Sequence, residues 1–197
     1  MPADARFRAR PRRIPPRRAA GRPCPLPRAL PARLAGRGWP VRTTLGRVQR
    51  AARAGVFNYR AAAWDGGPRL PTKAKFDGVL VDAPCSGIGT WHRNPHARWT
   101  TTAEDVKELS EVQQRLLLHA AGAVKPGGKL VYAACTLAEL ETTRVVQGFE
   151  QRCPEFERLA LSNPLAPKLP PSGPLFLWPQ ESGGNGMCVA AWVRTSV

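Results

Sequence analysis

Two uninterrupted apolar runs constrain the fold of this chain more than any other feature of its sequence. Residues 76–82 read Phe-Asp-Gly-Val-Leu-Val-Asp, and residues 129–134 read Lys-Leu-Val-Tyr-Ala-Ala. Runs without polar alternation are typical of strands that are buried on both faces. A helix with an apolar face is predicted between them, opened by an approximate capping box of Thr102 and Asp105, and a second helix follows over about 139–152. This order of strand, helix, strand and helix predicts an α/β fold with a parallel sheet covered by helices.

Shorter elements are predicted on either side of this unit. Residues 42–54 are expected to form a helix that Gly55 ends, and residues 57–64 a strand. Two more strands are expected near 156–161 and 187–194. The chain beyond residue 41 is therefore expected to be one α/β unit.

The positive charge of the chain is concentrated in its first quarter. The net charge is +16, and residues 1–53 carry 15 arginines against one acidic residue. Residues 1–40 also hold nine prolines and show no apolar period, so we expect this segment to be disordered. Three interpretations stay open: a basic arm that contacts RNA phosphates, an organelle transit peptide, or translation from a wrong frame or a misplaced start.

The cysteines and the hydropathy of the chain indicate a cytoplasmic location. No apolar run reaches the roughly 18 residues of a membrane span, and no apolar region marks a secretory signal. The odd number and wide scatter of the cysteines favour reduced thiols over a disulfide framework. They lie at five positions: Cys24, Cys85, Cys135, Cys153 and Cys188. Cys153 and Cys188 are expected to be ordinary core residues.

Chemically useful side chains follow three of the predicted strands. Ligands of an open α/β sheet bind beyond the carboxyl ends of its strands. Asp65 ends one strand, Asp82 and Cys85 follow the next, and Cys135 follows the third. Neighbouring strands lie about 4.8 Å apart, so the two cysteines are predicted to face one pocket with Asp82 beside them. Two thiols and a carboxylate suit covalent chemistry on an electron-poor ring.

These segments resemble two motifs of a known family. Residues 82–87 (Asp-Ala-Pro-Cys-Ser-Gly), with 93–95 (Arg-Asn-Pro) and Trp99, resemble the fourth motif of the Nop/Sun family of S-adenosylmethionine-dependent RNA (cytosine-5) methyltransferases. Residues 125–137 resemble the sixth motif, with Glu141 at the expected distance beyond it. The resemblance covers about residues 41–197 and implies a partial methyltransferase catalytic domain with a Rossmann-like class I sheet.

The resemblance assigns expected roles to the matching residues. It implies methylation of C5 of cytosine in RNA, with ribosomal RNA the expected partner and S-adenosyl-L-methionine the cofactor. Cys135 would attack C6 of the base as a thiolate, and Cys85 would assist release of the adduct. Asp82 would contact N3 of the base and border the methionine end of the cofactor, with Pro84 beside it, and Asp65 would contact the adenine. No metal site is expected, because Pro95 interrupts any helix between His92 and His96.

The chain also departs from the family pattern. Ala134 replaces the usual Thr or Ser before the nucleophile, and Thr142 replaces an Asn that commonly follows the acid. No glycine-rich loop precedes Asp65, so the expected sheet order 3-2-1-4-5-7-6 apparently lacks its first two strands. The strand at 76–82 would then present an apolar edge, for which a proline-rich segment is a poor partner.

Alternative functions remain at this point. A DNA cytosine-5 methyltransferase would use Cys85 as its nucleophile, and a catalytically dead remnant would only bind RNA. Arg93, Arg98 and Trp99 fit contacts with RNA, and they equally fit a solvated face and a core aromatic.

Overall fold

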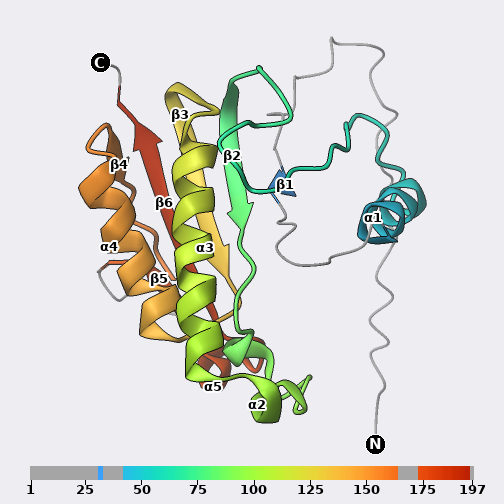
Figure 1. The fold of residues 1–197 in the computed structure, drawn as a ribbon, viewed down its shortest axis with the longest axis vertical. Coiled ribbons are helices and arrows are strands. Elements are labelled where there is room, and N and C mark those ends of the chain that lie inside the picture. Colours follow the sequence, from blue (N-terminus) through green and yellow to red (C-terminus); the bar gives the residue numbers. More distant parts are fainter. Residues whose placement is uncertain (1–30, 33–41, 164–172, 196–197) are drawn as a thin grey trace, which may run out of the picture.

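The computed structural model describes residues 31–32, 42–163 and 173–195. The described part contains six strands in one sheet, with five helices and two 3-10 turns around it (Figure 1). The strands are β1 (Pro31–Ala32), β2 (Phe76–Asp82), β3 (Val124–Ala134), β4 (Phe156–Arg158), β5 (Leu175–Leu177) and β6 (Met187–Arg194). The helices are α1 (Arg42–Arg53), α2 (Ala97–Thr100), α3 (Ala103–Ala121), α4 (Thr143–Arg152) and α5 (Pro179–Ser182), and the 3-10 turns are η1 (Ile88–Thr90) and η2 (Glu139–Glu141). Apart from β1, the segment 1–40 lies outside the described residues.

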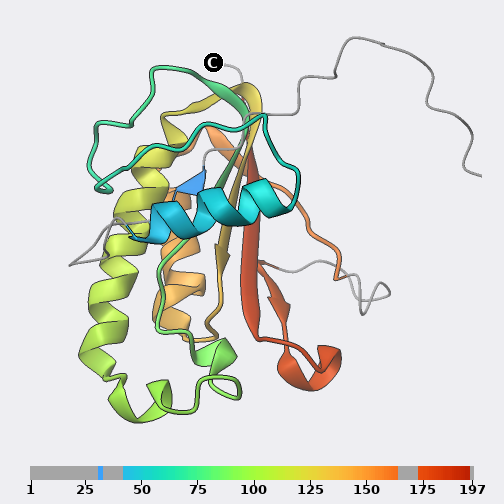
Figure 2. The ribbon, with the colours of Figure 1, turned by 90° about the vertical axis from the view of Figure 1, so that its right-hand side faces the viewer.

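The sheet is mixed, with the order β1-β2-β3-β6-β4 and β5 also paired to β6. β2 and β3 are parallel and are connected through α3, as the two apolar runs predict. β6 returns antiparallel between β3 and β4. The order β2-β3-β6-β4 is that of the last four strands of the expected methyltransferase sheet, so the predicted Rossmann-like fold is confirmed. α3 and α4 lie side by side on one face of this sheet (Figures 1 and 2).

The core lies between this pair of helices and the sheet. Helix α3 begins at the predicted capping box, in which the Asp105 amide donates to Thr102 Oγ1 at 3.2 Å and the Thr102 amide donates to Asp105 Oδ2 at 2.8 Å. Its Leu116 and Leu117 are buried against the sheet. On the α4 side, the rings of Phe149 and Trp192 pack 4.7 Å apart. Both aromatic side chains are almost completely buried, which anchors β6 in the sheet centre.

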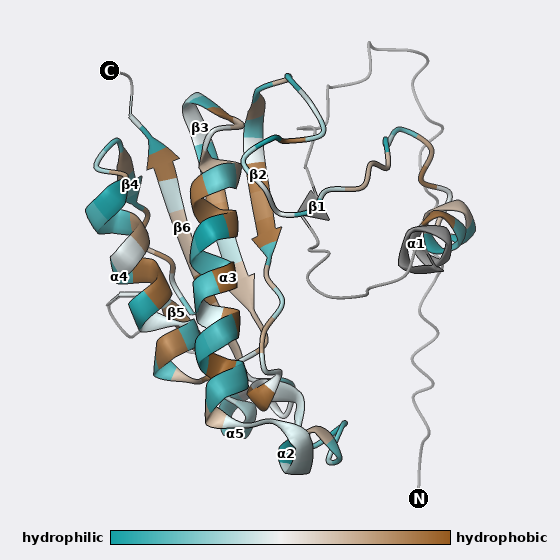
Figure 3. Cartoon of the chain, viewed as in Figure 1, coloured by the Kyte–Doolittle hydropathy of each residue, from teal (hydrophilic) through white to brown (hydrophobic). Residues whose placement is uncertain are grey.

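The apolar run of β2 is buried on one face only, which corrects the sequence prediction. Val79 and Val81 are buried, whereas Leu80 between them is 42% exposed. Figure 3 shows the hydrophobic colour along much of β2. Successive side chains of a strand point to opposite faces, and α3 and α4 cover only one of them. Along its outer edge β2 pairs with β1 at just two positions, Pro31 opposite Leu80 and Ala32 opposite Val81.

The strand predicted over residues 57–64 is wrong. These residues have no regular secondary structure, and Phe57 is 89% exposed. A strand needs a neighbour for its backbone hydrogen bonds, and among the described residues β1 is the strand that pairs with the outer edge of β2. Trp64 is the buried member of the segment, and its Nε1 donates to the Gly67 carbonyl at 2.9 Å.

Other element boundaries follow the sequence closely. Helix α1 ends two residues before Gly55, which has φ +65°, as expected for a glycine that terminates a helix. β3 begins earlier than predicted, at Val124, because 126–128 form an irregular part of the strand with a register shift against β2 instead of a turn before it. β4 stops at Arg158, three residues short of the prediction. No helix in the described part of the chain is long and apolar enough to cross a membrane.

Candidate active site

The site is built where the parallel strands β2 and β3 end side by side. The amide of Ala83 donates to the carbonyl of Ala133 at 3.0 Å, which keeps the two chains in register beyond the strands. The amide of Gly89 in η1 then donates to the carbonyl of Cys135 at 3.1 Å. Gly89 approaches the backbone of Gly186 so closely that an added Cβ would lie 2.0 Å from the Gly186 carbonyl oxygen. Glycine at this position therefore allows the loops after β2 and before β6 to pack against the Cys135 loop.

The two predicted cysteines meet at this point. Cys85 Sγ and Cys135 Sγ lie 3.2 Å apart, so the two side chains are as close as the strand ends predict. A hydrogen bond from Cys85 lowers the pKa of Cys135 to about 7, whereas the nearby Asp82 carboxylate acts in the opposite direction. The same hydrogen bond, together with burial, raises the pKa of Cys85. Near neutral pH Cys135 is therefore partly ionised, while Cys85 keeps its proton.

The remaining described cysteines are core residues, as predicted. Cys153 and Cys188 are buried, and burial raises the pKa of both, that of Cys188 to about 12. Burial without a partner that stabilises the thiolate makes a cysteine inert. Protection of these two thiols from alkylation can therefore show that the fold is intact.

The lowered pKa of Cys135 gives a testable pH dependence of its alkylation. In the native chain, alkylation of Cys135 by iodoacetamide should rise with pH around a midpoint of about 7. Cys85→Ala removes the hydrogen bond that stabilises the thiolate, so the midpoint should move up toward the ordinary thiol value of about 8.5. Mass spectrometry of the Cys135 peptide across a pH series measures both midpoints. An unchanged midpoint in Cys85→Ala would show that the two thiols are not coupled.

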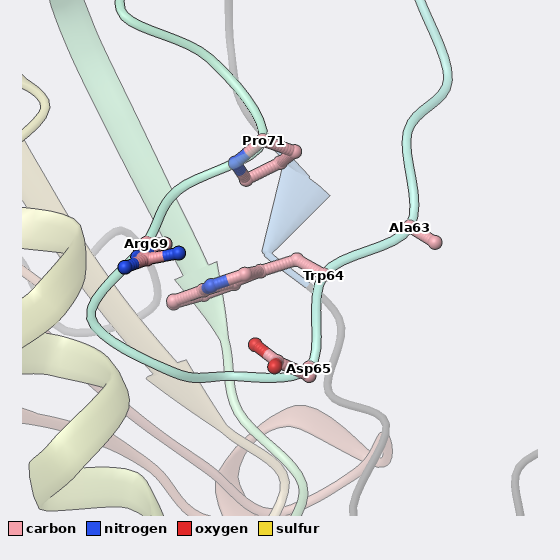
Figure 4. Close-up of a pocket in the computed structure, with 5 residues that line it drawn as sticks. All are labelled: Ala63, Trp64, Asp65, Arg69 and Pro71. Atoms are coloured by element: carbon pink, nitrogen blue, oxygen red, sulfur yellow. The ribbon is translucent and has the colours of Figure 1, made fainter.

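The predicted site residues other than the cysteines fall into two places. Asp82 is exposed at the end of β2, and Pro84 lies between it and Cys85, with its carbonyl accepting from Gln113 Nε2 at 2.8 Å. Asp65 lies apart from this group, in a loop. It lines an open hollow of about 410 Å³ together with Trp64, Arg69 and two smaller residues (Figure 4).

The Asp65 loop is itself held in place by hydrogen bonds. Asp65 Oδ1 accepts from the Gly67 amide at 2.8 Å, which is the turn-capping role of an Asp-Gly sequence. The Gly66 carbonyl lies 2.8 Å from His119 Nδ1 on α3, so this turn is attached to the central helix. Asp65 therefore has a structural role in the turn and also faces the hollow.

A buried carboxylate that sequence reasoning gave no role lies behind the two thiols. Glu141 in η2 is completely buried, and its carboxylate accepts hydrogen bonds from Ser86, Gln113 and Thr136. In the sequence, Glu141 could be identified only by its distance beyond the sixth motif. Gln113 could have been found from helical spacing, because it lies three and four residues before Leu116 and Leu117 and so shares their buried face.

An exposed basic and aromatic surface continues from the Cys85 loop. Trp99 is 80% exposed, and the Arg98 guanidinium carbon lies 5.6 Å from the centre of its ring. Arg93 is also exposed, and no acidic residue occurs between Asp82 and Glu104. Of the alternatives left open for Trp99, the core aromatic is therefore excluded, and Trp99 lies on the surface.

Comparison with known proteins identifies the family. The family model described as 16S rRNA methyltransferase RsmB/F matches residues 45–193. The chain belongs to this family. A probable ribosomal RNA small subunit methyltransferase B of Bacillus subtilis is 38% identical over 121 residues, which are 59% of this chain and 27% of the relative. A methyltransferase F of Aeromonas salmonicida is 37% identical over 145 residues, 70% of this chain and 30% of the relative.

Solved structures agree with the fold. A methyltransferase homologue from Pyrococcus horikoshii matches with a TM-score of 0.60 and 27% identity, over 76% of this chain and 50% of the other. The NSun6 structure from the same organism matches with a TM-score of 0.62 and 21% identity, over 76% of this chain and 38% of the other. The chain of this RsmB/F family member spans about a quarter to a third of the length of the curated relatives it matches.

Proposed function

We propose that this chain is the thiol-bearing part of an enzyme that methylates C5 of cytosine in ribosomal RNA, with S-adenosyl-L-methionine as methyl donor. One observation carries the proposal. Two thiols 3.2 Å apart end adjacent parallel strands, one with its pKa lowered to about 7 and the other with its pKa raised. Addition to C6 of a pyrimidine requires a nucleophile that is ionised near neutral pH, and a hydrogen bond from the Cys85 thiol stabilises the thiolate that addition consumes and elimination releases.

The chain's own residues can perform the covalent steps. The Cys135 thiolate forms a bond to C6 of the flipped base, and the electrons of the C5–C6 double bond make C5 nucleophilic. Bound S-adenosyl-L-methionine supplies the methyl group that C5 takes. Transfer of the C5 proton to a water molecule then returns the electrons to the ring, breaks the bond between Cys135 Sγ and C6, and restores the Cys135 thiolate. Cys85 lies in contact with that sulfur and is placed to assist this release.

The residues around the site fit parts of the cofactor. The hollow beside Trp64 and Asp65 offers an aromatic wall and a carboxylate, which suit an adenine ring and its exocyclic amine (Figure 4). Asp65 uses one carboxylate oxygen to cap its own turn, and the second oxygen can accept from that amine. Asp82, near Cys135, would border the methionine end and contact N3 of the base.

Transfer of labelled methyl groups to bulk RNA tests this function. The assay is run on the 197-residue chain and on a chimaera in which the B. subtilis sequence that precedes the matched region is placed ahead of residue 41. We expect 5-methylcytidine from the chimaera and far less from the 197 residues. Among the described residues we assign cofactor contacts to Asp65, Asp82 and Pro84 alone, and misplacement of the cofactor by about 1 Å can cost roughly 100-fold in rate.

The methylated nucleoside decides between the alternatives. Label in another nucleoside or in the ribose of the chimaera product would contradict the proposed chemistry. RNA binding by a chimaera that transfers no methyl group would favour the catalytically dead remnant. Transfer to DNA that needs Cys85 and not Cys135 would favour the DNA-type enzyme.

The exposed Trp99 surface gives a prediction on RNA affinity. A base can stack on Trp99 while Arg98 contacts a phosphate, and such stacking contributes about 1–3 kcal/mol per base. Trp99→Ala should therefore weaken binding of single-stranded RNA by roughly 5- to 150-fold. Fluorescence anisotropy of a labelled oligonucleotide at low salt measures the change. Phe57→Ala, which removes an equally exposed aromatic elsewhere, is the control and should have little effect.

A further inference from the structure

We propose that Glu141 is a positioning residue for the two thiols: its carboxylate joins the Cys85 loop, the Cys135 loop and helix α3, and so sets the contact between the sulfurs. This inference rests on the proposed function only for the catalytic role of the two thiols. Its geometry stands on the hydrogen bonds of the carboxylate itself.

The carboxylate accepts four hydrogen bonds from three segments of the chain. Oε1 accepts from the Ser86 amide at 2.8 Å and from Gln113 Nε2 at 3.0 Å. Oε2 accepts from Ser86 Oγ at 2.5 Å and from Thr136 Oγ1 at 2.8 Å. Ser86 directly follows Cys85, and Thr136 directly follows Cys135. Each thiol is therefore one residue away from a hydrogen bond to the same buried side chain.

The buried groups around Glu141 require a hydrogen-bond acceptor at this position. The Ser86 amide and Gln113 Nε2 can only donate, so Oε1 has to be an acceptor. Loss of the carboxylate would leave these buried donors without a partner, and such groups are costly inside a protein.

The backbone of Glu141 is also held by a hydrogen bond. The Tyr132 hydroxyl donates to the Glu141 carbonyl at 2.6 Å, and Tyr132 and Gln113 are both completely buried. Gln113 also donates to the carbonyl of Pro84, immediately before Cys85. The Glu141 carboxylate is thus fixed by α3 and β3, and the thiol loops are fixed by the carboxylate.

The pKa of Cys135 separates this role from a simple effect of charge. The negative charge of Glu141 by itself raises the pKa of Cys135, so removal of the charge alone would lower that pKa. Separation of the loops would instead remove the hydrogen bond from Cys85, which is the largest cause of the lowered pKa. Positioning and charge therefore predict opposite shifts.

The experiment is the pH series of Cys135 alkylation on the 197-residue chain, with iodoacetamide as the probe. For Glu141→Ala we expect the midpoint to rise by more than one pH unit from its native value of about 7. Glu139→Ala is the matched control, because Glu139 lies two residues away on the surface, where it pairs with Arg144 at 2.9 Å. Its midpoint should not change. Peptides that contain Cys153 and Cys188 should stay unlabelled in both variants if the fold is intact.

Each result decides for or against the positioning role. A midpoint of Glu141→Ala that stays at its native value or falls, with Cys153 and Cys188 still protected, overturns the proposal. If that variant labels at all cysteines, it has unfolded, and Thr136→Val then decides. This variant keeps the Glu141 charge and removes the hydroxyl that links the Cys135 loop to Glu141 Oε2, to Ser86 Oγ and to the Ala138 amide. The midpoint should therefore rise, and an unchanged midpoint overturns the proposal. Because no RNA or cofactor takes part, failure of the proposed function would appear separately, in the methyl-transfer assay.

Discussion

Methyl transfer by the chimaera should fall to the background of the assay when Cys135 is replaced by alanine. This substitution removes the only described thiol whose pKa is lowered, and with it the bond to C6 that makes C5 reactive. Cys85→Ala should behave differently. It leaves a nucleophile in place but removes the group that assists release, so turnover should stop after about one methyl group per protein molecule.

Single-turnover and steady-state rates with labelled S-adenosyl-L-methionine distinguish the two variants. Cys153→Ala is the control, because Cys153 is buried away from the site and should leave both rates near the native values. Full single-turnover transfer by Cys135→Ala would show that another residue attacks the base.

Asp82→Asn should reduce kcat by about 10²–10³-fold, the range for loss of one group that stabilises charge at a reacting centre. The loss of kcat should come from the chemical step and not from a smaller fraction of Cys135 thiolate. Asp82 raises the pKa of Cys135, so its neutralisation would, if anything, leave more of the thiolate at neutral pH. A lower rate with a more ionised nucleophile would assign Asp82 to the base or to the cofactor.

Asp65→Asn is the matched comparison for Asp82. Asp65 faces the hollow beside Trp64 and offers at most one contact to the adenine, worth about 1–3 kcal/mol for a hydrogen bond to a charged group. Its substitution should raise the KM for the cofactor with a smaller change in kcat. Equal losses of kcat in the two variants, measured by initial rates over a range of cofactor concentrations, would contradict this ranking.

Local sequence patterns predicted the central elements of the fold because a helix cap or an apolar run depends on residues that are close in sequence. The capping box of Thr102 and Asp105 starts α3 as predicted, and the run 187–194 forms β6 with the predicted bounds. The strand predicted over 57–64 failed because a strand depends on a partner that is remote in sequence. Leu80 is exposed for a related reason, since the face of β2 on which it lies is not covered by the described helices.

The sequence could predict the site residues that follow the strand ends, but not the residues that hold them in place. Parallel neighbours end together, so the proximity of Cys85 and Cys135 followed from topology. The partners of Glu141 did not, because its contacts span 55 residues to Ser86 and 28 residues to Gln113. No periodicity in a single sequence records such contacts, and only the folded chain brings them together.

The most direct test of the account is the site of covalent attachment to RNA. Cys85→Ala in the chimaera should accumulate a denaturation-resistant adduct with RNA when S-adenosyl-L-methionine is present, and Cys135→Ala should not. Digestion and mass spectrometry should then find the nucleotide on the peptide that contains Cys135. An adduct that forms in Cys135→Ala and is located on Cys85 would reverse the roles of the two thiols and contradict the account.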